Sequence, residues 1–169
     1  RVGVVMPHGV LFRSGAEARI RQHLIESDLL EAVIGLPANL FYGAGIPACL
    51  LIFRKEKAAG DKGKVRIVDG SKRFVAGRAQ NSLSDQDVAA LFEAYTDTDA
   101  EIENVKQAVV DVSEIEANDW DLNIGRYIEQ DAAEIIDTAE ALKALRQAEQ
   151  NTAKAQTAMD ERLKAAGYA

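Results

Sequence analysis

Two apolar runs separated by a short connector place the tightest constraint on how this chain can fold. Leu29 to Leu36 and Ile46 to Phe53 are each about the length of a strand, and Pro37 to Gly45 between them is rich in turn-forming residues. Parallel neighbours need a crossover of about a dozen residues or more, and this connector is shorter. The runs therefore predict two buried, adjacent, antiparallel strands that hold one loop between them.

A strand and a helix are predicted upstream of these runs. Val2 to Met6 is apolar on both faces and rich in β-branched residues, which is typical of a central strand of a parallel sheet. Ser14 to Glu17 has the pattern of a capping box, so a helix is expected to begin there, with Ile20 and Leu24 inward and Arg21 outward. Strand, helix and strand form a βαβ unit, which implies parallel pairing and a right-handed crossover. The sequence thus predicts an α/β fold with one reversed strand near the edge of an otherwise parallel sheet.

Further elements are predicted downstream. Val65 to Val68 and Val105 to Val112 are expected to be strands, and Ser113 to Glu116 a short helical turn. Ser84 to Asp87 has the pattern of a second N-terminal cap. Trp120 to Tyr127 is expected to be a connector anchored by isolated apolar residues. The helix after the second cap is expected to bury a face made of Val88, Leu91, Phe92 and Tyr95.

The last part of the chain has a helical pattern from about Asp131, with neither Pro nor Gly before Gly167. A stripe of small residues suits close packing against another helix, either a hairpin partner in the same segment or a helix of another subunit. Two parts are therefore expected, 1–128 and 129–169. The apolar stripe of the second part is made of Ile135, Leu142, Leu145, Ala148, Thr152, Ala155, Met159 and Leu163.

Charge is divided unequally along the chain. The net charge is -7, yet the segment up to Gln80 has 13 basic and 7 acidic residues, whereas the remainder has 7 basic and 20 acidic. A basic front half suggests a surface that faces an anion such as nucleic acid, and an acidic back half suggests a solvated or protein-contacting surface.

Composition indicates the cellular compartment in which the protein is expected. Cys49 is the single cysteine, so the sequence offers no internal disulfide and no cysteine cluster for a metal. No apolar run approaches the roughly 20 residues that span a bilayer, and the beginning has no secretion-signal pattern. A cytoplasmic protein with no membrane partner is expected by default. Because the chain begins at Arg1 with strand-like sequence next to it, we expect a piece of a longer protein.

The reactive residue types do not assemble into a self-contained active site. His8, His23 and Cys49 are better explained as two ordinary polar histidines and a buried structural cysteine than as a Cys/His nucleophile pair. Two histidines without a suitably spaced carboxylate make a poor metal site, so no metal is expected. Gly43 and Gly45 lack the full glycine fingerprint of a phosphate-binding loop.

An aromatic pair and a basic segment remain as candidates for ligand contact. Phe41 and Tyr42 lie in the connector between the two apolar runs and could stack on a nucleobase, although both rings could equally be core anchors. The basic segment could follow phosphates, although loop lysines are usually only solvated. Its candidate residues are Lys55, Lys57, Lys62 and Lys64.

Four segments resemble one known family in matching order. They are MPHGVLFRSGAEARIRQHLIE, LLEAVIGLPANLFYGAGIPACLLIFRK, VDGSKRFVAGRAQNSLSDQDVAALFEAY and NDWDLNIGRYI, and together they cover about Arg1 to Ile128. The chain resembles the C-terminal part of the modification subunit of type I restriction-modification systems. LPANLFYGAGIPACLLIF and DLNIGRYI are the motifs most specific to that family. The tail resembles it only in being helical.

The resemblance implies an enzyme that transfers a methyl group from S-adenosylmethionine to N6 of adenine in DNA, on a Rossmann-like sheet with a reversed strand near its edge. The family's glycine-rich cofactor motif and its Asn-Pro-Pro-aromatic catalytic motif do not occur in this sequence, so both are expected upstream of Arg1 and no catalytic residue is assigned here. This part alone is accordingly expected to be inactive.

The resemblance also implies roles for particular residues and partners. Such enzymes flip the target base and sandwich it between aromatic rings, and Phe41 matches the late motif that supplies a packing ring, with Tyr42 in reserve. The implied partners are DNA, the specificity subunit and the restriction subunit. The residues expected to contact the specificity subunit are Leu142, Leu145, Ala155, Met159 and Leu163. A different class of function, a non-catalytic α/β module for protein interaction, stays open.

Overall fold

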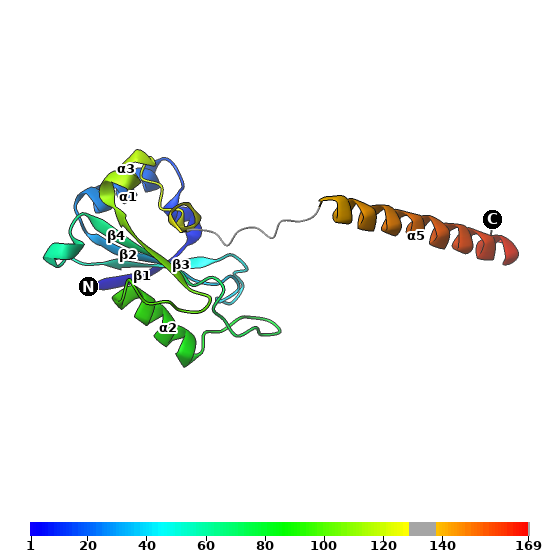
Figure 1. Cartoon of the computed structure of the whole chain (residues 1–169), viewed down its shortest axis with the longest axis horizontal. Coiled ribbons are helices and arrows are strands. Elements are labelled where there is room, and N and C mark those ends of the chain that lie inside the picture. Colours follow the sequence, from blue (N-terminus) through cyan, green and yellow to red (C-terminus); the bar gives the residue numbers. More distant parts are fainter. Residues whose placement is uncertain (129–137, 169) are drawn as a thin grey trace. The chain divides into compact units, whose positions relative to one another are not determined.

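The computed structural model of the chain describes residues 1–128 and 138–168. The chain divides into two compact units, Arg1–Glu129 and Gln130–Ala169, and each is considered by itself (Figure 1). The described part of the second unit is one helix, α5 (Thr138–Ala165), and the predicted helix start near Asp131 lies outside the described residues. Within 1–128 and 138–168, no helix is long and apolar enough to cross a bilayer.

A mixed five-stranded sheet forms the centre of the first unit, which confirms the predicted α/β class. The strand order is β1-β3-β2-β4-β5, in which β3 is antiparallel to both β1 and β2, β4 is parallel to β2, and β5 is antiparallel to β4. The predicted antiparallel pairing of the two apolar runs is confirmed. The strands are β1 (Val2–Pro7), β2 (Leu30–Gly35), β3 (Ala48–Phe53), β4 (Lys64–Asp69) and β5 (Lys106–Asp111).

The predicted direct pairing of β1 with β2 is wrong. Both strands run in the same direction, but the reversed strand β3 lies between them and pairs with each. Strand β3, the second strand of the hairpin, thus lies between the two strands that the helical crossover connects. β1 is consequently an end strand of the described sheet, with Val2 60% and Val5 49% exposed, rather than the central strand that its composition suggested.

Helix α1 (Ala16–Glu26) differs from its prediction at its start and on its buried face. Its N-cap is Gly15 at φ 78°, and no side chain caps it, so the predicted Ser14 capping box does not form. Ile20 is 61% exposed, whereas Arg21 is buried and its guanidinium donates to three backbone carbonyls. The inward residue is Ile25. Arg21 therefore turns inward because it finds hydrogen-bond acceptors there.

Helix α2 (Asp85–Thr96) has the predicted cap. The Ser84 hydroxyl accepts from the Asp87 amide, and the Asp87 carboxylate accepts from the Ser84 amide, which together make a capping box. The predicted buried face is only half right, because Val88 and Phe92 are 53% and 64% exposed. The apolar residues that face the sheet are Ala90, Leu91, Ala94 and Tyr95.

The remaining elements are short. They are the 3-10 helices η1 (His8–Leu11) and η2 (Ala59–Asp61), and the helices α3 (Val112–Ala117) and α4 (Ile124–Tyr127). The predicted helical turn after β5 is confirmed as α3. The connector that follows is anchored as predicted, because Leu122 and Ile124 are buried.

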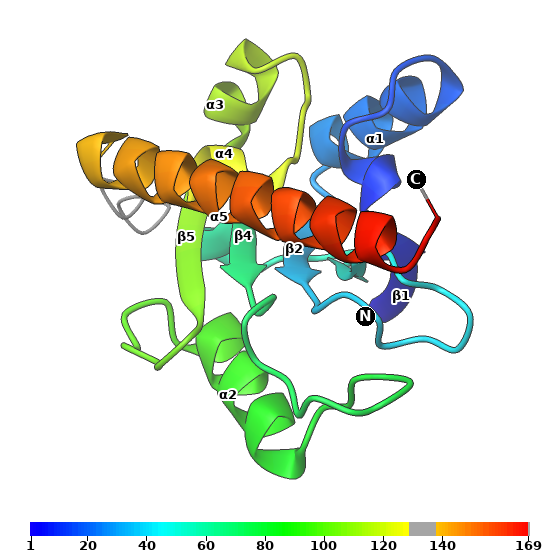
Figure 2. The ribbon, with the colours of Figure 1, turned by 90° about the vertical axis from the view of Figure 1, so that its right-hand side faces the viewer.

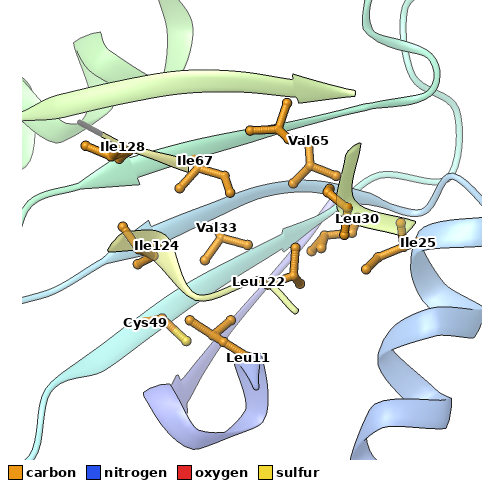
Figure 3. Close-up of a cluster of buried hydrophobic side chains, with 12 residues drawn as sticks. Leu11, Ile25, Leu30, Val33, Cys49, Val65, Ile67, Leu122, Ile124 and Ile128 are labelled. Atoms are coloured by element: carbon orange, nitrogen blue, oxygen red, sulfur yellow. The ribbon is translucent and has the colours of Figure 1, made fainter. Parts of the chain in front are cut away.

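The sheet separates two layers of core. Helices α1, α3 and α4 cover one face and α2 covers the other (Figure 2). A bulge in β2 between Leu30 and Ala32 shifts the alternation, so Leu30 and Val33 face the first layer and Ala32 and Ile34 face the second. Each fully buried Val, Leu or Ile contributes about 1.5–3 kcal/mol by leaving water. The first layer includes Leu11, Ile25, Leu30, Val33, Cys49, Val65, Ile67, Leu122, Ile124 and Ile128 (Figure 3).

Candidate nucleic-acid interface

The connector between β2 and β3 ends in a tight turn that carries the two aromatic rings. The Ala44 amide donates to the Phe41 carbonyl over 3.0 Å, and these two residues form an isolated bridge. Gly43 closes the turn at φ 73°, a conformation that favours glycine. The turn, residues 41–44, is called the aromatic turn below.

Both rings of the aromatic turn are accessible. Tyr42 is 97% exposed and Phe41 is 44% exposed, and neither belongs to either layer of the core. Within the described residues, neither ring therefore anchors the core. An accessible ring can stack on the face of a planar ligand such as a nucleobase.

The aromatic turn lies at the carboxyl end of β2. Gly35 pairs with Cys49 at this end of the hairpin, and the Leu36 amide donates to the Ala48 carbonyl over 2.9 Å just beyond it. β4 runs parallel to β2, so the connection that follows Asp69 leaves from the same end of the sheet. Ligands of open α/β sheets commonly bind at the carboxyl ends of parallel strands.

The basic segment lies at the opposite end of the sheet. Phe53, the last residue of β3, pairs with Val2 and Leu30 at the amino ends of β1 and β2. The segment from Arg54 to Lys64 follows Phe53 and includes η2, which Figure 1 shows at the far end of the sheet from the β2–β3 connector. The structure therefore does not bring the predicted lysines and the predicted aromatic rings together.

The four predicted lysines also differ in accessibility. Lys55 and Lys62 are exposed and Lys64 is half-buried. Lys57 is buried, and its ammonium group donates over 2.7 Å both to Asp28 Oδ1 and to the Lys64 carbonyl. These contacts give Lys57 a structural role in the segment, and its burial separates it from the exposed candidates for phosphate contact.

Neither Cys49 nor His23 supplies a reactive group to the aromatic turn. Cys49 is buried as predicted, and burial raises the pKa of its thiol to about 11, which makes it a poor nucleophile. His23 is exposed on α1. Over the described ranges 1–128 and 138–168, no group of three His, Cys, Asp or Glu residues is placed to hold a metal ion.

Helix α5, in the second unit, exposes the part of the predicted apolar stripe that the structure describes, and Ile135 lies outside the described residues. The large members of the stripe are 40–55% exposed, and Ala155 is exposed as well. Leu145, Ala148 and Thr152 line a shallow depression along the helix. The exposed large apolar residues are Leu142, Leu145, Met159 and Leu163.

Comparison with known proteins identifies curated relatives of one kind. The chain is 36% identical over 131 residues to the type I restriction enzyme MjaVII methylase subunit of Methanocaldococcus jannaschii, which covers 76% of this chain and 22% of that protein. It is 30% identical over 124 residues to the MpnII methylase subunit of Mycoplasma pneumoniae, which covers 73% of this chain and 22% of that protein. The chain thus spans less than a quarter of the length of these relatives.

Solved structures agree with this similarity. The type I restriction-modification methyltransferase subunit from Streptococcus thermophilus matches with a TM-score of 0.67 and 37% identity, over 75% of this chain and 26% of that chain. The EcoKI M protein matches with a TM-score of 0.58 over 86% of this chain and 38% of its own, and its 22% identity supports the fold alone. The family model described as N-6 DNA Methylase matches residues 1–135. With this match over most of its length, the chain belongs to the N-6 DNA methylase family.

Proposed function

We propose that this chain is a part of the methylase subunit of a type I restriction-modification enzyme, and that the whole protein transfers a methyl group from S-adenosylmethionine to N6 of adenine in DNA. Family membership and 36–37% identity to type I methylase subunits support this proposal. Within the whole protein, this part contributes the surface that receives the target base and the helix that joins another subunit.

The observation that carries the proposal is the exposure of Phe41 and Tyr42 on a tight turn at the carboxyl end of β2. Adenine has to leave the duplex before its amino group can be reached, and unstacking costs a few kcal/mol. Stacking on an aromatic ring returns roughly 1–3 kcal/mol per base. Phe41 is proposed as the ring that packs against the flipped adenine, with Tyr42 as the second candidate.

The test is methyl transfer from labelled S-adenosylmethionine to adenine-containing DNA by the full-length subunit assembled with its specificity subunit. Phe41→Ala is expected to lower turnover by on the order of 10- to 100-fold, from the loss of one stacking contact. It should lower the fluorescence change of a base analogue at the target position and leave cofactor affinity nearly intact. Phe92→Ala is the matched control, because Phe92 is an exposed ring on α2. An unchanged methylation rate for Phe41→Ala would exclude the role of this ring.

The apolar cavity of the first unit does not fit S-adenosylmethionine itself. The apolar cavity between β1, β3 and α1 has a volume of about 260 Å³ and is lined by residues such as Met6, Leu24 and Phe53. Its charged lining residues are Glu17 and Arg21, and the Arg21 guanidinium is already occupied by three carbonyls. A zwitterionic cofactor with a ribose needs accessible polar partners, so this cavity is not assigned to the cofactor, whose main site is proposed to lie in the rest of the protein.

The exposed lysines at the other end of the sheet are kept as candidates for a phosphate contact away from the target base. Lys55, Lys62 and Lys64 carry charge at the surface or close to it. Neutralising them together should flatten the salt dependence of DNA binding by the whole complex if they bind phosphates. An identical slope would remove them from the interface.

Helix α5 is proposed to pack against helices of the specificity subunit. Its apolar stripe is exposed in its own unit, and small residues such as Ala148 and Ala155 permit close approach of another helix. Leu145→Glu and Met159→Glu should weaken co-purification of the specificity subunit. Gln150→Glu adds the same charge on the opposite side of the helix and should not. Equal binding by all three variants would show that α5 is not the contact.

The exposed stripe of α5 also favours the second candidate function, a non-catalytic interaction module. The methyl-transfer assay separates the two functions. Activity that appears only in the full assembly supports the methylase, because this part is expected to lack the catalytic motif. Absence of activity in both the isolated part and the assembly supports the module.

A further inference from the structure

A second hairpin leaves the same end of the sheet as the aromatic turn. After β4, the Val75 amide donates to the Ser82 carbonyl over 2.8 Å and the Ser82 amide donates back over 3.0 Å. At its tip the chain is so tight that a Cβ added to Gly77 would lie 2.0 Å from the Gln80 carbonyl oxygen. Residues 73–82 therefore form a defined hairpin, called the 73–82 hairpin below.

The 73–82 hairpin is joined to the chain just before the aromatic turn. The Asn81 amide donates to the Asn39 carbonyl over 2.8 Å, and its side chain donates to the Ala38 carbonyl over 3.0 Å. The Gln80 side chain donates to the Leu40 carbonyl, one residue before Phe41. Since backbone carbonyls on both sides of Asn39 are held in this way, the hairpin and the aromatic turn form one continuous surface.

The charge of this surface is entirely basic. Residues 37–47 carry no charge, and residues 70–83 carry three basic and no acidic side chains, Lys72, Arg73 and Arg78. Arg73 is occupied, because it donates to Asp87 Oδ1 and to the Glu103 carbonyl, each over 3.1 Å. Arg78 is exposed near the tip, and no other residue in the described part of the chain engages its guanidinium.

Exposed apolar groups accompany Arg78 on the hairpin. Phe74 is 42% exposed and Val75 is 51% exposed. A ring and a free guanidinium beside an accessible aromatic pair are the combination that binds single-stranded or locally unpaired nucleic acid, in which rings stack on bases and cations track the backbone.

We propose that the 73–82 hairpin is a second DNA contact, in which Arg78 binds a phosphate next to the flipped adenine and Phe74 packs against a neighbouring nucleotide. The inference rests on the proposed function and extends it to residues outside the aromatic turn. A guanidinium fits a phosphate with two parallel N–H donors, which positions the strand as well as attracting it. Because the hairpin is fixed to the residues beside Phe41, it would hold the DNA strand in place while the flipped adenine enters its site.

The phosphate beside the base is assigned to Arg78 rather than to the predicted lysines because of distance. The segment from Arg54 to Lys64 is separated from the aromatic turn by the length of the sheet strands, about 20 Å for six residues. One residue separates Arg78 from Gln80, which donates a hydrogen bond to Leu40, the residue next to Phe41.

The experiment is a double-mutant cycle between Arg78 and single phosphates, carried out with the full methylase assembly. Once the methylated adenine has been located, each phosphate within three nucleotides of it is replaced in turn by an uncharged methylphosphonate. For one of these, wild-type binding should weaken about three- to tenfold, the size of one exposed charge-assisted contact. Arg78→Gln should be weakened by a similar factor on native DNA and should be insensitive to that replacement.

A control variant and the contrary outcomes distinguish the hairpin contact from the proposed methylase function. Arg19→Gln removes an exposed positive charge on α1, which has no assigned DNA contact, and should keep full sensitivity to the same phosphate. If the effects of Arg78→Gln and every replacement simply add, the hairpin contact is wrong while the methylase function stands. If Arg78→Gln and Phe74→Ala release the specificity subunit and leave DNA affinity unchanged, the surface binds protein and the inference is overturned. If no DNA is methylated by the assembly, the proposed function fails, and the inference falls with it.

Discussion

The Gly70 amide donates a hydrogen bond of 3.0 Å to the Gly35 carbonyl oxygen, at the point where the parallel strands β2 and β4 end. Both glycines are closely packed: a Cβ on Gly70 would lie 2.3 Å from Leu91 Cδ2, and one on Gly35 would lie 2.7 Å from Ile124 Cδ1. The connector with the aromatic turn begins after Gly35, and the connection with the 73–82 hairpin begins after Gly70. The two segments of the proposed interface thus both begin next to this tightly packed pair of glycines.

Replacing Gly70 should destabilise the protein through overpacking. The Cβ that Gly70→Ala adds displaces the Leu91 side chain and the Gly35 backbone. The expected loss is about 1–3 kcal/mol in the free energy of unfolding. Gly60→Ala is the control, because an added Cβ there has no atom within 4 Å. Urea unfolding of the two variants measures the difference. Equal urea midpoints for the two variants would mean that the Leu91 side chain rearranges without loss of stability.

The cap of α2 gives a second stability prediction, with its control supplied by the chain. Ser84→Ala removes the hydroxyl that accepts from the Asp87 amide and should cost about 1 kcal/mol. Ser14→Ala should be nearly neutral, since α1 is capped by Gly15 without a side-chain bond. Thermal unfolding compares the two. A comparable loss for Ser14→Ala would contradict the cap assigned to α1.

Asp87 should make stability depend on pH in the acid range. Hydrogen bonds from the Ser84 side chain and amide, assisted by Arg73, hold the pKa of Asp87 below its usual value. A carboxyl whose folded pKa is depressed stabilises the fold above its unfolded pKa of about 3.9, and this contribution disappears as pH falls through the folded pKa. The stability difference between wild type and Asp87→Asn should be largest at neutral pH and shrink below about pH 4. A difference that stays constant down to pH 2 would show that the charge of Asp87 has no part in it.

The buried Arg21 should be required for folding stability. Its guanidinium donates to the carbonyls of Trp120, Val10 and Arg13 at 2.6–3.1 Å. Arg21→Met keeps much of the aliphatic volume but removes the donors from three carbonyls, at an expected cost of about 2–4 kcal/mol. Arg19→Met, at an exposed position on the same helix, should change stability by less than about 0.5 kcal/mol. Similar unfolding midpoints for both variants would contradict the assigned role.

The reversed hairpin could be predicted from the sequence because its signal is local. Two strand-length apolar runs and a connector too short for a crossover leave few alternatives, and the capping box at Ser84 is likewise contained within four residues. The place of β1 could not be predicted in this way. Local sequence indicates that a strand exists, but its neighbour depends on which edge the later strand β3 occupies.

The candidate interface was predictable only in part, for a related reason. Exposed aromatic rings next to glycines mark the aromatic turn, yet its link to Gln80 and Asn81 joins residues about forty positions apart. Arg21 meets the Trp120 carbonyl over a still longer separation, so its helical position among charged residues suggested exposure instead. The count of lysines in the basic segment likewise did not reveal which ammonium group is buried.

The burial of Lys57 separates it from the exposed lysines of the basic segment. Its ammonium group lies 2.7 Å from Asp28 Oδ1 and from the Lys64 carbonyl oxygen, and its side chain is 1% exposed. Lys57→Met should therefore destabilise the protein by about 1–3 kcal/mol, because the carbonyl loses its donor and the carboxylate its cation. Lys62→Met, at an exposed position five residues later, should leave the unfolding midpoint unchanged. If Lys57→Met unfolded like wild type and instead weakened DNA binding by the full assembly, Lys57 would belong with the exposed lysines as a phosphate contact.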